Sequence, residues 1–273
     1  MGPVRSWLFT PGNRPDRFAN AGKAGADVVI LDLEDAVTRE DKAIARSAVL
    51  EFLSSPAPEG PRSALRINGL DTGCGIGDIH ALLGWHAVPD YLVLPKTEGA
   101  GHLQILDRLL TAKECGTRLV GIVESARGLA AVQEIAAATP RLAGLMLGAA
   151  DMAADLGIAT TWAPLAHARS SIVLACTLAG VMPIDSPFFD LRDVEGLASE
   201  ATDAAAFGFH AKAAIHPNQV RTINNGFTPS REDVEHARAV LAANAMGVGI
   251  VNDRMIDEAV ARKARRVLAA AGQ

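Results

Sequence analysis

Two apolar segments of strand length run into carboxylates. Residues 118–123 are followed directly by Glu124, and residues 142–147 are followed four positions later by Asp151. The carboxyl ends of parallel strands in a barrel meet at one mouth, so we expect these two side chains to face each other. Two hard oxygen ligands that leave room for water and substrate suit Mg²⁺, and Mn²⁺ accepts the same ligands. The pair is therefore a candidate metal site.

The alternative interpretation is that each acid caps the N-terminus of the helix predicted after it, which is common for Asp and less so for Glu. Polar residues, however, follow one strand pattern after another along the whole chain. They are Arg14, Asp32, Glu34, Asp35, Arg66, Asn68, Lys96, Glu124, Asp151, Asp185 and His216. Capping alone does not explain so regular a series, and we favour an active site at a barrel mouth.

Strand-like and helix-like patterns alternate along the chain. The predicted strands are 6–10, 27–33, 63–68, 91–95, 118–123, 142–147, 181–184 and 209–215, and several are runs of Val, Ile and Leu typical of buried parallel strands. The predicted helices include 39–54, 102–115, 127–138, 165–179 and 194–207. These units predict an α/β fold, a (β/α)8 TIM barrel, with an open doubly wound sheet as the runner-up.

Composition narrows the functional class. The 273 residues are 49% hydrophobic and 21% charged, which suffices for one large core. The net charge of −5 and the lack of a basic block argue against nucleic acid as a partner. No apolar run approaches the ~18 residues of a membrane span, and no signal-peptide pattern opens the chain. The three widely spaced cysteines are typical of reduced thiols, so we expect a cytoplasmic protein.

The last part of the sequence does not fit a barrel unit. Ser230 followed by Asp233 signals the start of a helix, a Gly-rich stretch comes next, and residues 255–271 form a last helical pattern. We therefore assign residues 1–228 to a catalytic barrel and 229–273 to a C-terminal helical extension. The extension either packs under its own barrel or contacts a neighbouring subunit.

Short segments in a fixed order carry a family resemblance. They are residues 5–14 (RSWLFTPGNR), 31–37 (LDLEDAV), 65–68 (LRIN), 94–96 (LPK), 122–128 (IVESARG), 148–151 (GAAD), 214–217 (AIHP) and 254–257 (RMID). Together they resemble the citrate lyase β-subunit and malyl-CoA lyase group of the HpcH/HpaI aldolase superfamily. The second and fifth segments are specific as a pair, whereas any single segment would be a weak signal.

The resemblance implies a Mg²⁺-dependent carbon–carbon lyase that acts on the CoA thioester of a 3-hydroxy acid. Known members cleave malyl-, citramalyl-, citryl- or related 3-hydroxyacyl-CoA compounds to acetyl-CoA or a homologue and a keto acid or ketone. By the same resemblance, Glu124 and Asp151 bind the metal, which holds the oxygens of the keto-acid half. Glu34 and Asp35 are expected to hold metal-bound waters, although Asp35 is explained equally well as an acid at a helix N-terminus.

Two cationic residues are expected at the same mouth. Arg66 ends an apolar strand, stays charged and offers two N–H groups to the oxygen whose charge changes during C–C cleavage. Lys96 is expected to hold a carboxylate or to pair with Glu34. We do not interpret Lys96 as a Schiff-base lysine, because the resemblance belongs to metal-dependent chemistry.

The family uses an acid on its C-terminal tail to protonate the CoA-derived enolate in an adjacent subunit. Asp257 matches that acid, and Asp253 competes for the role. Without the resemblance, Asp257 would be interpreted as an acid in the first turn of a helix. The match implies an oligomer, and we expect a homotrimer.

CoA requires contacts for its phosphates and its thioester arm. Arg14 and Arg17 are expected to meet phosphate, with Lys23 as a weaker candidate. Ile215 and His216, after the last predicted strand, are expected to wall the thioester arm. The partners implied are therefore small molecules, an acyl-CoA and a keto acid.

One departure and two alternative functions stay open. Ala150 stands where many relatives have an additional acid, so the site carries less negative charge. The chain could be a metal-dependent aldolase on free pyruvate, in which case CoA thioesters would not bind. It could instead be a regulatory barrel, or a citrate lyase β-subunit whose activity appears only with partner subunits.

Overall fold

The computed structural model describes residues 3–55, 60–245, 249–251 and 254–272. Eight parallel strands close into a barrel, each hydrogen-bonded to the next and β8 to β1. They are β1 (Ser6–Pro11), β2 (Val28–Asp32), β3 (Arg62–Arg66), β4 (Tyr91–Leu94), β5 (Arg118–Val123), β6 (Leu142–Leu147), β7 (Met182–Asp185) and β8 (Ala211–Ala214). Each overlaps a predicted strand, so the (β/α)8 barrel is confirmed and the open sheet is wrong.

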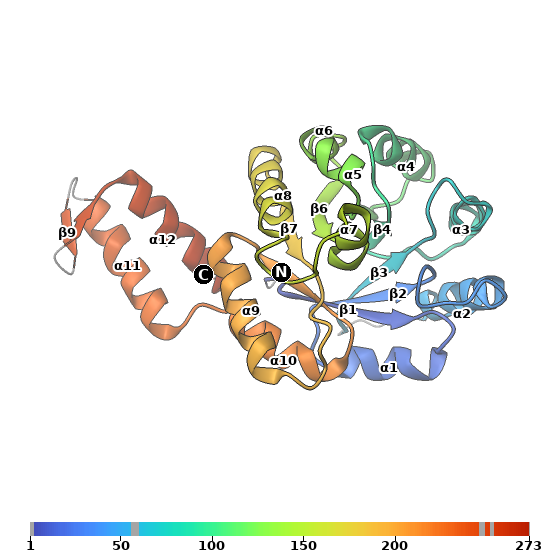
Figure 1. The fold of residues 1–273 in the computed structure, drawn as a ribbon, viewed down its shortest axis with the longest axis horizontal. Helices are drawn as coiled ribbons and strands as arrows, with labels where there is room; N and C mark the ends of the chain where they lie inside the picture. The colour runs from blue at the N-terminus through green and yellow to red at the C-terminus, as the bar shows by residue number, and fades with distance from the viewer. Residues whose placement is uncertain (1–2, 56–59, 246–248, 252–253, 273) are drawn as a thin grey trace.

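Helices surround the barrel (Figure 1). They are α1 (Pro15–Lys23), α2 (Lys42–Leu53), α3 (Gly73–Gly84), α4 (Ala100–Ala112), α5 (Ala126–Ala130), α6 (Val132–Ala136), α7 (Ala149–Leu156), α8 (Ala166–Ala179), α9 (Val194–Phe207) and α10 (Pro217–Gly226). The predicted helix 127–138 is two short helices, because the backbone leaves the helical region at Ala131 (φ −96°, ψ 7°). Over the described ranges, no helix is both long and apolar enough to cross a membrane.

Side chains alternate between the inside of the barrel and the layer against the helices, as the two-residue period of a strand requires. Trp7, Ile30, Val93, Ile122 and Met146 belong to the buried inner cluster. A second and larger apolar cluster fills the space between the strands and the helices. The next inward position after the inner cluster lies at the carboxyl end of each strand, where barrel enzymes place their sites.

One group of charges is buried between the barrel wall and the helices. Lys212 on β8 is fully buried, and its Nζ donates to Asp185 Oδ2 and Glu200 Oε1, each at 2.7 Å. The same Nζ donates to the carbonyl oxygen of Ser186 at 2.8 Å. Arg169 on α8 pairs with the other oxygen of Asp185 at 3.0 Å. Three acceptors thus satisfy the ammonium, which fixes the chain just after β7.

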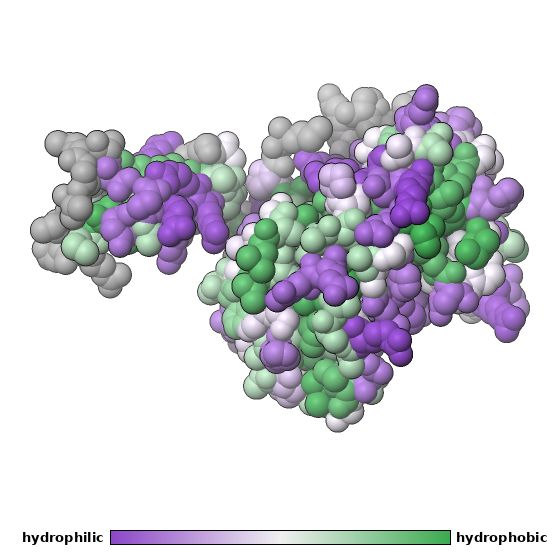
Figure 2. Space-filling view, turned by 90° about the horizontal axis from the view of Figure 1, so that it is seen from above, coloured by the Kyte–Doolittle hydropathy of each residue, from purple (hydrophilic) through white to green (hydrophobic). Residues whose placement is uncertain are grey.

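A helical hairpin follows the barrel and stands away from it in both views (Figures 1 and 2). It is built from α11 (Arg231–Ala245), β9 (Gly249–Val251), β10 (Arg254–Ile256) and α12 (Glu258–Ala270). Its own buried apolar cluster joins its two helices and comprises Ala237, Val240, Ile256 and Ala264. The hairpin therefore has a small core separate from that of the barrel.

The base of the hairpin lies at the amino-terminal face of the barrel, opposite the mouth. Arg5, just before β1, donates from Nη1 to Thr228 Oγ1 at 2.9 Å, and α11 begins three residues after Thr228. Burial lowers the pKa of His210, just before β8, and the nearby Arg266 of α12 lowers it further. Strands β9 and β10 form the far tip (Figure 1).

Replacing Lys212 with methionine removes the ammonium from the buried charge group. Breaking a buried ion pair from one side costs about 3–5 kcal/mol, because the remaining charges lose their partner. We expect Lys212→Met to lower the free energy of unfolding by about 3 kcal/mol, measured by urea denaturation. Lys263, exposed on α12, is the matched control, and Lys263→Met should change stability by less than about 0.5 kcal/mol. Equal effects of the two substitutions would contradict the structural role of Lys212.

Candidate active site

The inward-pointing residues at the carboxyl ends of several strands line one cavity of about 230 Å³. Among them are Phe9, Asp32, Arg66, Glu124, Gly148 and Ile215. Each stands two positions after a member of the inner cluster, as Asp32 does after Ile30 and Glu124 after Ile122. The alternation that fills the barrel therefore also directs these residues to the mouth.

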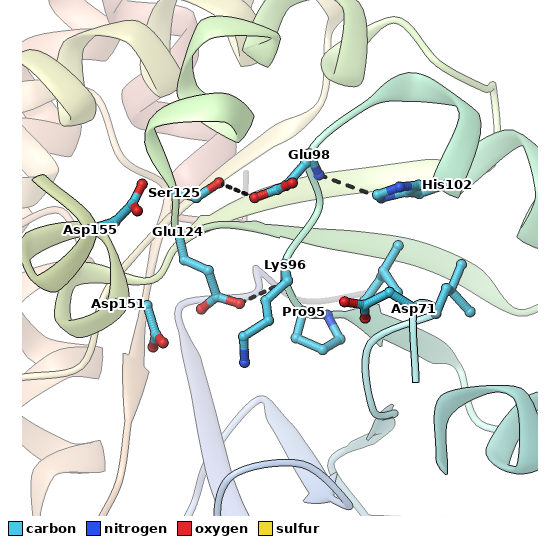
Figure 3. Close-up of a pocket in the computed structure, with 11 residues that line it drawn as sticks. Asp71, Pro95, Lys96, Glu98, His102, Glu124, Ser125, Asp151 and Asp155 are labelled. Carbon is cyan, nitrogen blue, oxygen red and sulfur yellow. Dashed lines mark hydrogen bonds between the residues drawn. The ribbon is translucent and has the colours of Figure 1, made fainter. Parts of the chain in front are cut away.

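Glu124 and Asp151 are brought together there, as predicted from their strand ends. Both line this cavity, and both also line a neighbouring cavity, toward which Figure 3 shows their carboxylates directed. Neither acid occupies the N-cap of the helix that follows it. Ser125 caps α5 by accepting the backbone N–H of Gly128 at 3.1 Å, and Gly148 is the N-cap of α7. The alternative interpretation of these acids as N-caps is therefore wrong.

Two backbone features place the Glu124 carboxylate. Lys96 has a φ of +48°, a conformation sparsely populated by residues other than glycine, and its N–H donates to Glu124 Oε1 at 2.6 Å. Gly148 gives the side chain room on the other side, because a Cβ there would stand 2.4 Å from Glu124 Oε2 and 2.5 Å from Glu124 Cβ. Any larger residue at position 148 would displace the carboxylate.

The Glu124 carboxyl is held in an environment that disfavours its charge. Burial raises its pKa to about 7, and the negative charges of Glu34 and Asp151 add to the increase. The hydrogen bond from Lys96 and the charge of Arg66 lower the pKa without cancelling the rise. The carboxyl therefore binds a proton near neutral pH when no other cation is bound.

Carboxylates clamp Arg66. Its Nε and Nη2 each donate at 2.6 Å to Asp32, which is its register partner on β2, and its Nη1 lies 2.7 Å from Glu34 Oε2. Burial acts to lower the pKa of Arg66, but the charges of Asp32 and Glu34 outweigh it and raise the pKa above its ordinary value. The guanidinium carbon also lies 4.7 Å from the ring centre of Phe9. This predicted oxygen donor is thus charged and fixed in its plane.

Lys96 pairs with Glu34, one of the two partners expected for it, with 2.5 Å between Nζ and Oε1. Burial acts to lower the pKa of Lys96, but the hydrogen bond to Glu34 and its charge raise it above the ordinary value. Burial raises the pKa of Glu34, against the charges of Arg66 and Lys96. Lys96 is therefore a paired ammonium and not the neutral amine that a Schiff base requires.

A second cavity, of about 340 Å³, shares Glu124 and Asp151 with the first (Figure 3). Its wall adds polar side chains from the segments after β3, β4, β5 and β6, namely Asp71, Glu98, His102, Ser125 and Asp155. Ser125 Oγ donates to Glu98 Oε1 at 2.8 Å. The two acids thus stand at the junction of two spaces, so a ligand held by them can extend into both.

The fixed charges at the mouth do not balance. Two cations, Arg66 and Lys96, face five carboxylates, those of Asp32, Glu34, Asp35, Glu124 and Asp151. Negative charge is therefore in excess at the mouth, which favours a bound cation, and carboxylate oxygens are the ligands that Mg²⁺ prefers. The described ranges contain no cluster of three or more His, Cys, Asp or Glu suited to a metal ion. A metal held by Glu124 and Asp151 would therefore keep positions for water and substrate.

The four predicted CoA contacts differ in where they lie. Ile215 lines the cavity of about 230 Å³, as expected. His216 instead caps α10, with its Nδ1 accepting a backbone N–H from the first turn at 3.2 Å. Arg14 and Arg17 are exposed at the start of α1, where Arg14 pairs with Asp16 at 2.7 Å, and neither lines the two cavities at the mouth.

Asp257 is not brought to the mouth of its own barrel. It is the N-cap of α12, and its Oδ1 accepts the backbone N–H of Val260 at 3.0 Å. Helix α12 begins at the far tip of the hairpin, whose base lies opposite the mouth (Figure 1). Asp253, the competing candidate, lies outside the described residues.

No role was predicted for Asp32 or Gly148 from the sequence. The contact of Asp32 with Arg66 could have been suspected, because both are charged residues near the ends of consecutive strands, and neighbours in a parallel sheet lie side by side. The signal for Gly148 was its place between a strand and a helix, where a close backbone approach favours glycine.

Comparisons with known proteins identify the family of the chain. Residues 5–217 match the family described as HpcH/HpaI aldolase/citrate lyase. The L-malyl-CoA/beta-methylmalyl-CoA lyase of Rhodobacter capsulatus is 38% identical over 97% of this chain and 93% of its own length. The crystal structure of RipC from Yersinia pestis is 57% identical and aligns with a TM-score of 0.76 over 85% of this chain and 98% of its own. CitE from Mycobacterium tuberculosis, in complex with magnesium, acetoacetate and coenzyme A, is 38% identical and aligns with a TM-score of 0.84 over 100% of this chain and 98% of its own.

The pKa of Glu124 predicts a pH-dependent stability of the metal-free protein. Because the folded pKa of about 7 exceeds the ordinary value of 4.5, the folded state binds the proton more tightly than the unfolded state. Its stabilising effect is complete below pH 4.5 and is lost as the pH rises through about 7. Glu124→Gln keeps the hydrogen bond from Lys96 without titrating. With a chelator present, we expect the wild type to lose about 2–3 kcal/mol of unfolding free energy relative to the variant when the pH is raised from 5 to 8.

Urea denaturation at several pH values measures this difference. Glu134→Gln, at an exposed position on α6, is the matched control and should follow the wild type at each pH. Parallel pH profiles for the wild type and Glu124→Gln would show that the Glu124 carboxyl is not destabilised by its surroundings.

Proposed function

The chain belongs to the HpcH/HpaI aldolase/citrate lyase family, and from that premise we propose that it is a Mg²⁺-dependent carbon–carbon lyase. Its substrate is the CoA thioester of a 3-hydroxy acid, such as malyl-, citramalyl-, citryl- or 3-hydroxy-3-methylglutaryl-CoA. The products are acetyl-CoA or a homologue and a keto acid or ketone. The observation that carries the proposal is the Glu124–Asp151 pair beside Arg66 in one cavity at the carboxyl end of the barrel.

Glu124 and Asp151 are the metal ligands in this proposal. The excess of negative charge at the mouth and the raised pKa of Glu124 support them. The magnesium, acetoacetate and coenzyme A bound by the CitE relative support the same ligand classes here. When bound, Mg²⁺ supplies a Lewis acid and a template for the oxygens of the keto-acid half, and Mn²⁺ suits the same ligands.

Arg66 acts on the oxygen whose charge changes. In the cleavage direction the hydroxyl gives its proton to water and its oxygen becomes a carbonyl. The electron pair of the C–C bond passes to the α-carbon of the thioester, which then takes a proton from an acid, so the reaction consumes no net proton. Because Asp32 and Glu34 fix the guanidinium in advance, no reorganisation is needed as charge develops on the oxygen. Glu34 orients Arg66 and Lys96, and in this proposal it would also hold waters of the metal.

Asp257 of a neighbouring copy supplies the proton to the α-carbon in this proposal. The position of Asp257 at the far tip of the hairpin, away from its own mouth, supports donation to a second copy (Figure 1). A closed ring in which each hairpin reaches the next barrel satisfies every site, and we propose a homotrimer.

CoA lies across the mouth next to these groups. Ile215 forms part of the wall for the thioester arm, and Arg14 and Arg17, exposed after β1, are available to its phosphates. His216 contributes through the backbone it caps at the start of α10.

A substrate panel tests the proposal directly. Release of acetyl-CoA or propionyl-CoA is measured from malyl-, citramalyl-, citryl- and 3-hydroxy-3-methylglutaryl-CoA with Mg²⁺ and with a chelator. We expect metal-dependent cleavage of at least one thioester and a loss of about 10³-fold or more in Glu124→Ala and Asp151→Asn, since a Lewis acid contributes several kcal/mol. Glu134→Ala should retain wild-type activity.

Failure of the panel would point to one of the two other functions. If Mn²⁺ binds but no thioester is cleaved or bound, pyruvate with an aldehyde tests the free-pyruvate aldolase. Restoration of cleavage by acyl-carrier partner subunits would instead identify a β-subunit of a larger lyase.

Mixed oligomers test the shared site. Glu124→Ala and Asp257→Ala are each expected to be inactive, and they are produced together in equal amounts. If one copy supplies Asp257 to the barrel of the next, random assembly restores about one quarter of wild-type activity, because half of the barrels and half of the donors are intact. An active monomer in sedimentation, or no recovery in the mixture, would overturn the shared site.

A further inference from the structure

Two connecting segments form the apolar wall of the mouth cavity on the side of β7 and β8. Pro187 and Phe189, on the segment 186–193 between β7 and α9, line the cavity that contains Arg66, and so does Ile215 after β8. Phe189 is 48% exposed and Ile215 is 38% exposed, so core packing does not hold either side chain. The backbone of the two segments therefore sets where this wall stands.

One buried amide bonds to the backbone of both segments. Gln219 on α10 is 4% exposed. Its Oε1 accepts the N–H of Ile215 at 2.9 Å and the N–H of His216 at 3.2 Å. Its Nε2 donates to the carbonyl oxygen of Phe188 at 2.7 Å. A single side chain thus joins the neighbour of Phe189 to the backbone of Ile215.

Lys212 also anchors the segment 186–193, but it does not join that segment to the backbone of Ile215. Its ammonium holds the carbonyl oxygen of Ser186, at the start of the segment, from the layer between the barrel and the helices. Phe189 lies three positions after Ser186, whereas the anchor at Phe188 lies next to the wall residue itself. The spacing between Phe189 and Ile215 therefore depends on Gln219.

We propose that Gln219 is a positioning residue for the substrate. By bonding to both segments it sets the distance between Phe189 and Ile215, and so the shape of the wall that meets the thioester side of the acyl-CoA. The inference rests on the proposed function and adds a determinant of substrate fit to it. An amide is required, because one end accepts two N–H groups while the other donates to a carbonyl.

Gln219→Glu separates the two halves of this link. The assay is run at about pH 8.5, which favours the ionised glutamate over the protonated form that could donate as the amide does. The ionised side chain keeps an acceptor for Ile215 and His216 but puts a carboxylate oxygen without a proton against the Phe188 carbonyl. We expect the KM for the cleaved thioester to rise about tenfold with kcat changed less than about threefold. Gln104→Glu, exposed on α4, is the matched control and should leave both constants unchanged. Mn²⁺ affinity is measured on every variant and should stay at the wild-type value.

A merely structural role for Gln219 predicts a different result. It would lower the melting temperature and the amount of active enzyme, and so kcat, while the folded fraction kept the wild-type KM. That outcome would overturn the proposal.

Phe189→Ala provides a test that does not depend on the folding of the Gln219 variant. Its side chain is exposed, so the substitution should fold normally and raise KM by itself. If Gln219 acts through this wall, adding Gln219→Glu to Phe189→Ala should raise KM by less than about a further twofold. Additive effects on KM, or a wild-type KM for Phe189→Ala, would overturn the proposal.

Thioester binding is followed by calorimetry together with cleavage, which separates the two proposals. If the wild type binds a CoA thioester but does not cleave it, the proposed function fails. The comparison of Gln219→Glu, Phe189→Ala and the double variant is then made on the Kd of the thioester in place of KM. If the wild type binds no thioester, both proposals fail.

Discussion

Carboxylates held out of water need compensation, and at the mouth of this barrel the compensation runs through Arg66. Its guanidinium bonds to Asp32 and Glu34, and Glu34 also pairs with Lys96. Negative and positive side chains therefore alternate in the series Asp32, Arg66, Glu34 and Lys96, and each has a neighbour of opposite charge. Glu124 stands where the alternation ends and receives a backbone N–H instead of a full positive charge. That incomplete compensation explains both its raised pKa and the suitability of the site for a divalent cation.

The backbone around Glu124 departs from favourable conformation to maintain this arrangement. Lys96 adopts a positive φ so that its N–H points at the carboxylate, and such strain costs on the order of 1–3 kcal/mol. Gly148 has no side chain at the point where the Glu124 carboxylate lies, and a Cβ there would clash with it. Strained or bare backbone persists where the surrounding structure enforces it, and here the closed barrel provides that enforcement. The site is thus the place where local preference yields to function, which is the usual position of such conflicts.

How much of this follows from the sequence depends on the range of the interaction. The strands and the meeting of Glu124 with Asp151 follow from hydrophobic patterning and from the rule that parallel strands end at one mouth. Asp32 and Arg66 lie near the ends of consecutive predicted strands, so their proximity could be expected, but their register came only from the structure. The bond from Gln219 to the His216 N–H is a local capping-box contact three residues apart, whereas the bond to the Phe188 carbonyl depends on how two irregular segments approach each other in space. The ring of His216 caps α10, and its contact with a ligand stays a prediction.

The electrostatics of the mouth also bear on where a proton donor for carbon can come from. Arg66 and Lys96 both have raised pKa values, so neither releases a proton readily near neutral pH. Glu124 and Asp151 must each be deprotonated to hold a metal, so neither can also carry the proton that the α-carbon takes. An additional acid placed permanently among these carboxylates would increase the excess negative charge and raise its own pKa further. A carboxyl carried on a separate hairpin avoids this conflict, because its hydrogen bonds in α12 are made away from the mouth. The proposed mechanism takes this acid from a second copy of the chain, and the separation of Asp257 from the mouth of its own barrel agrees with that proposal.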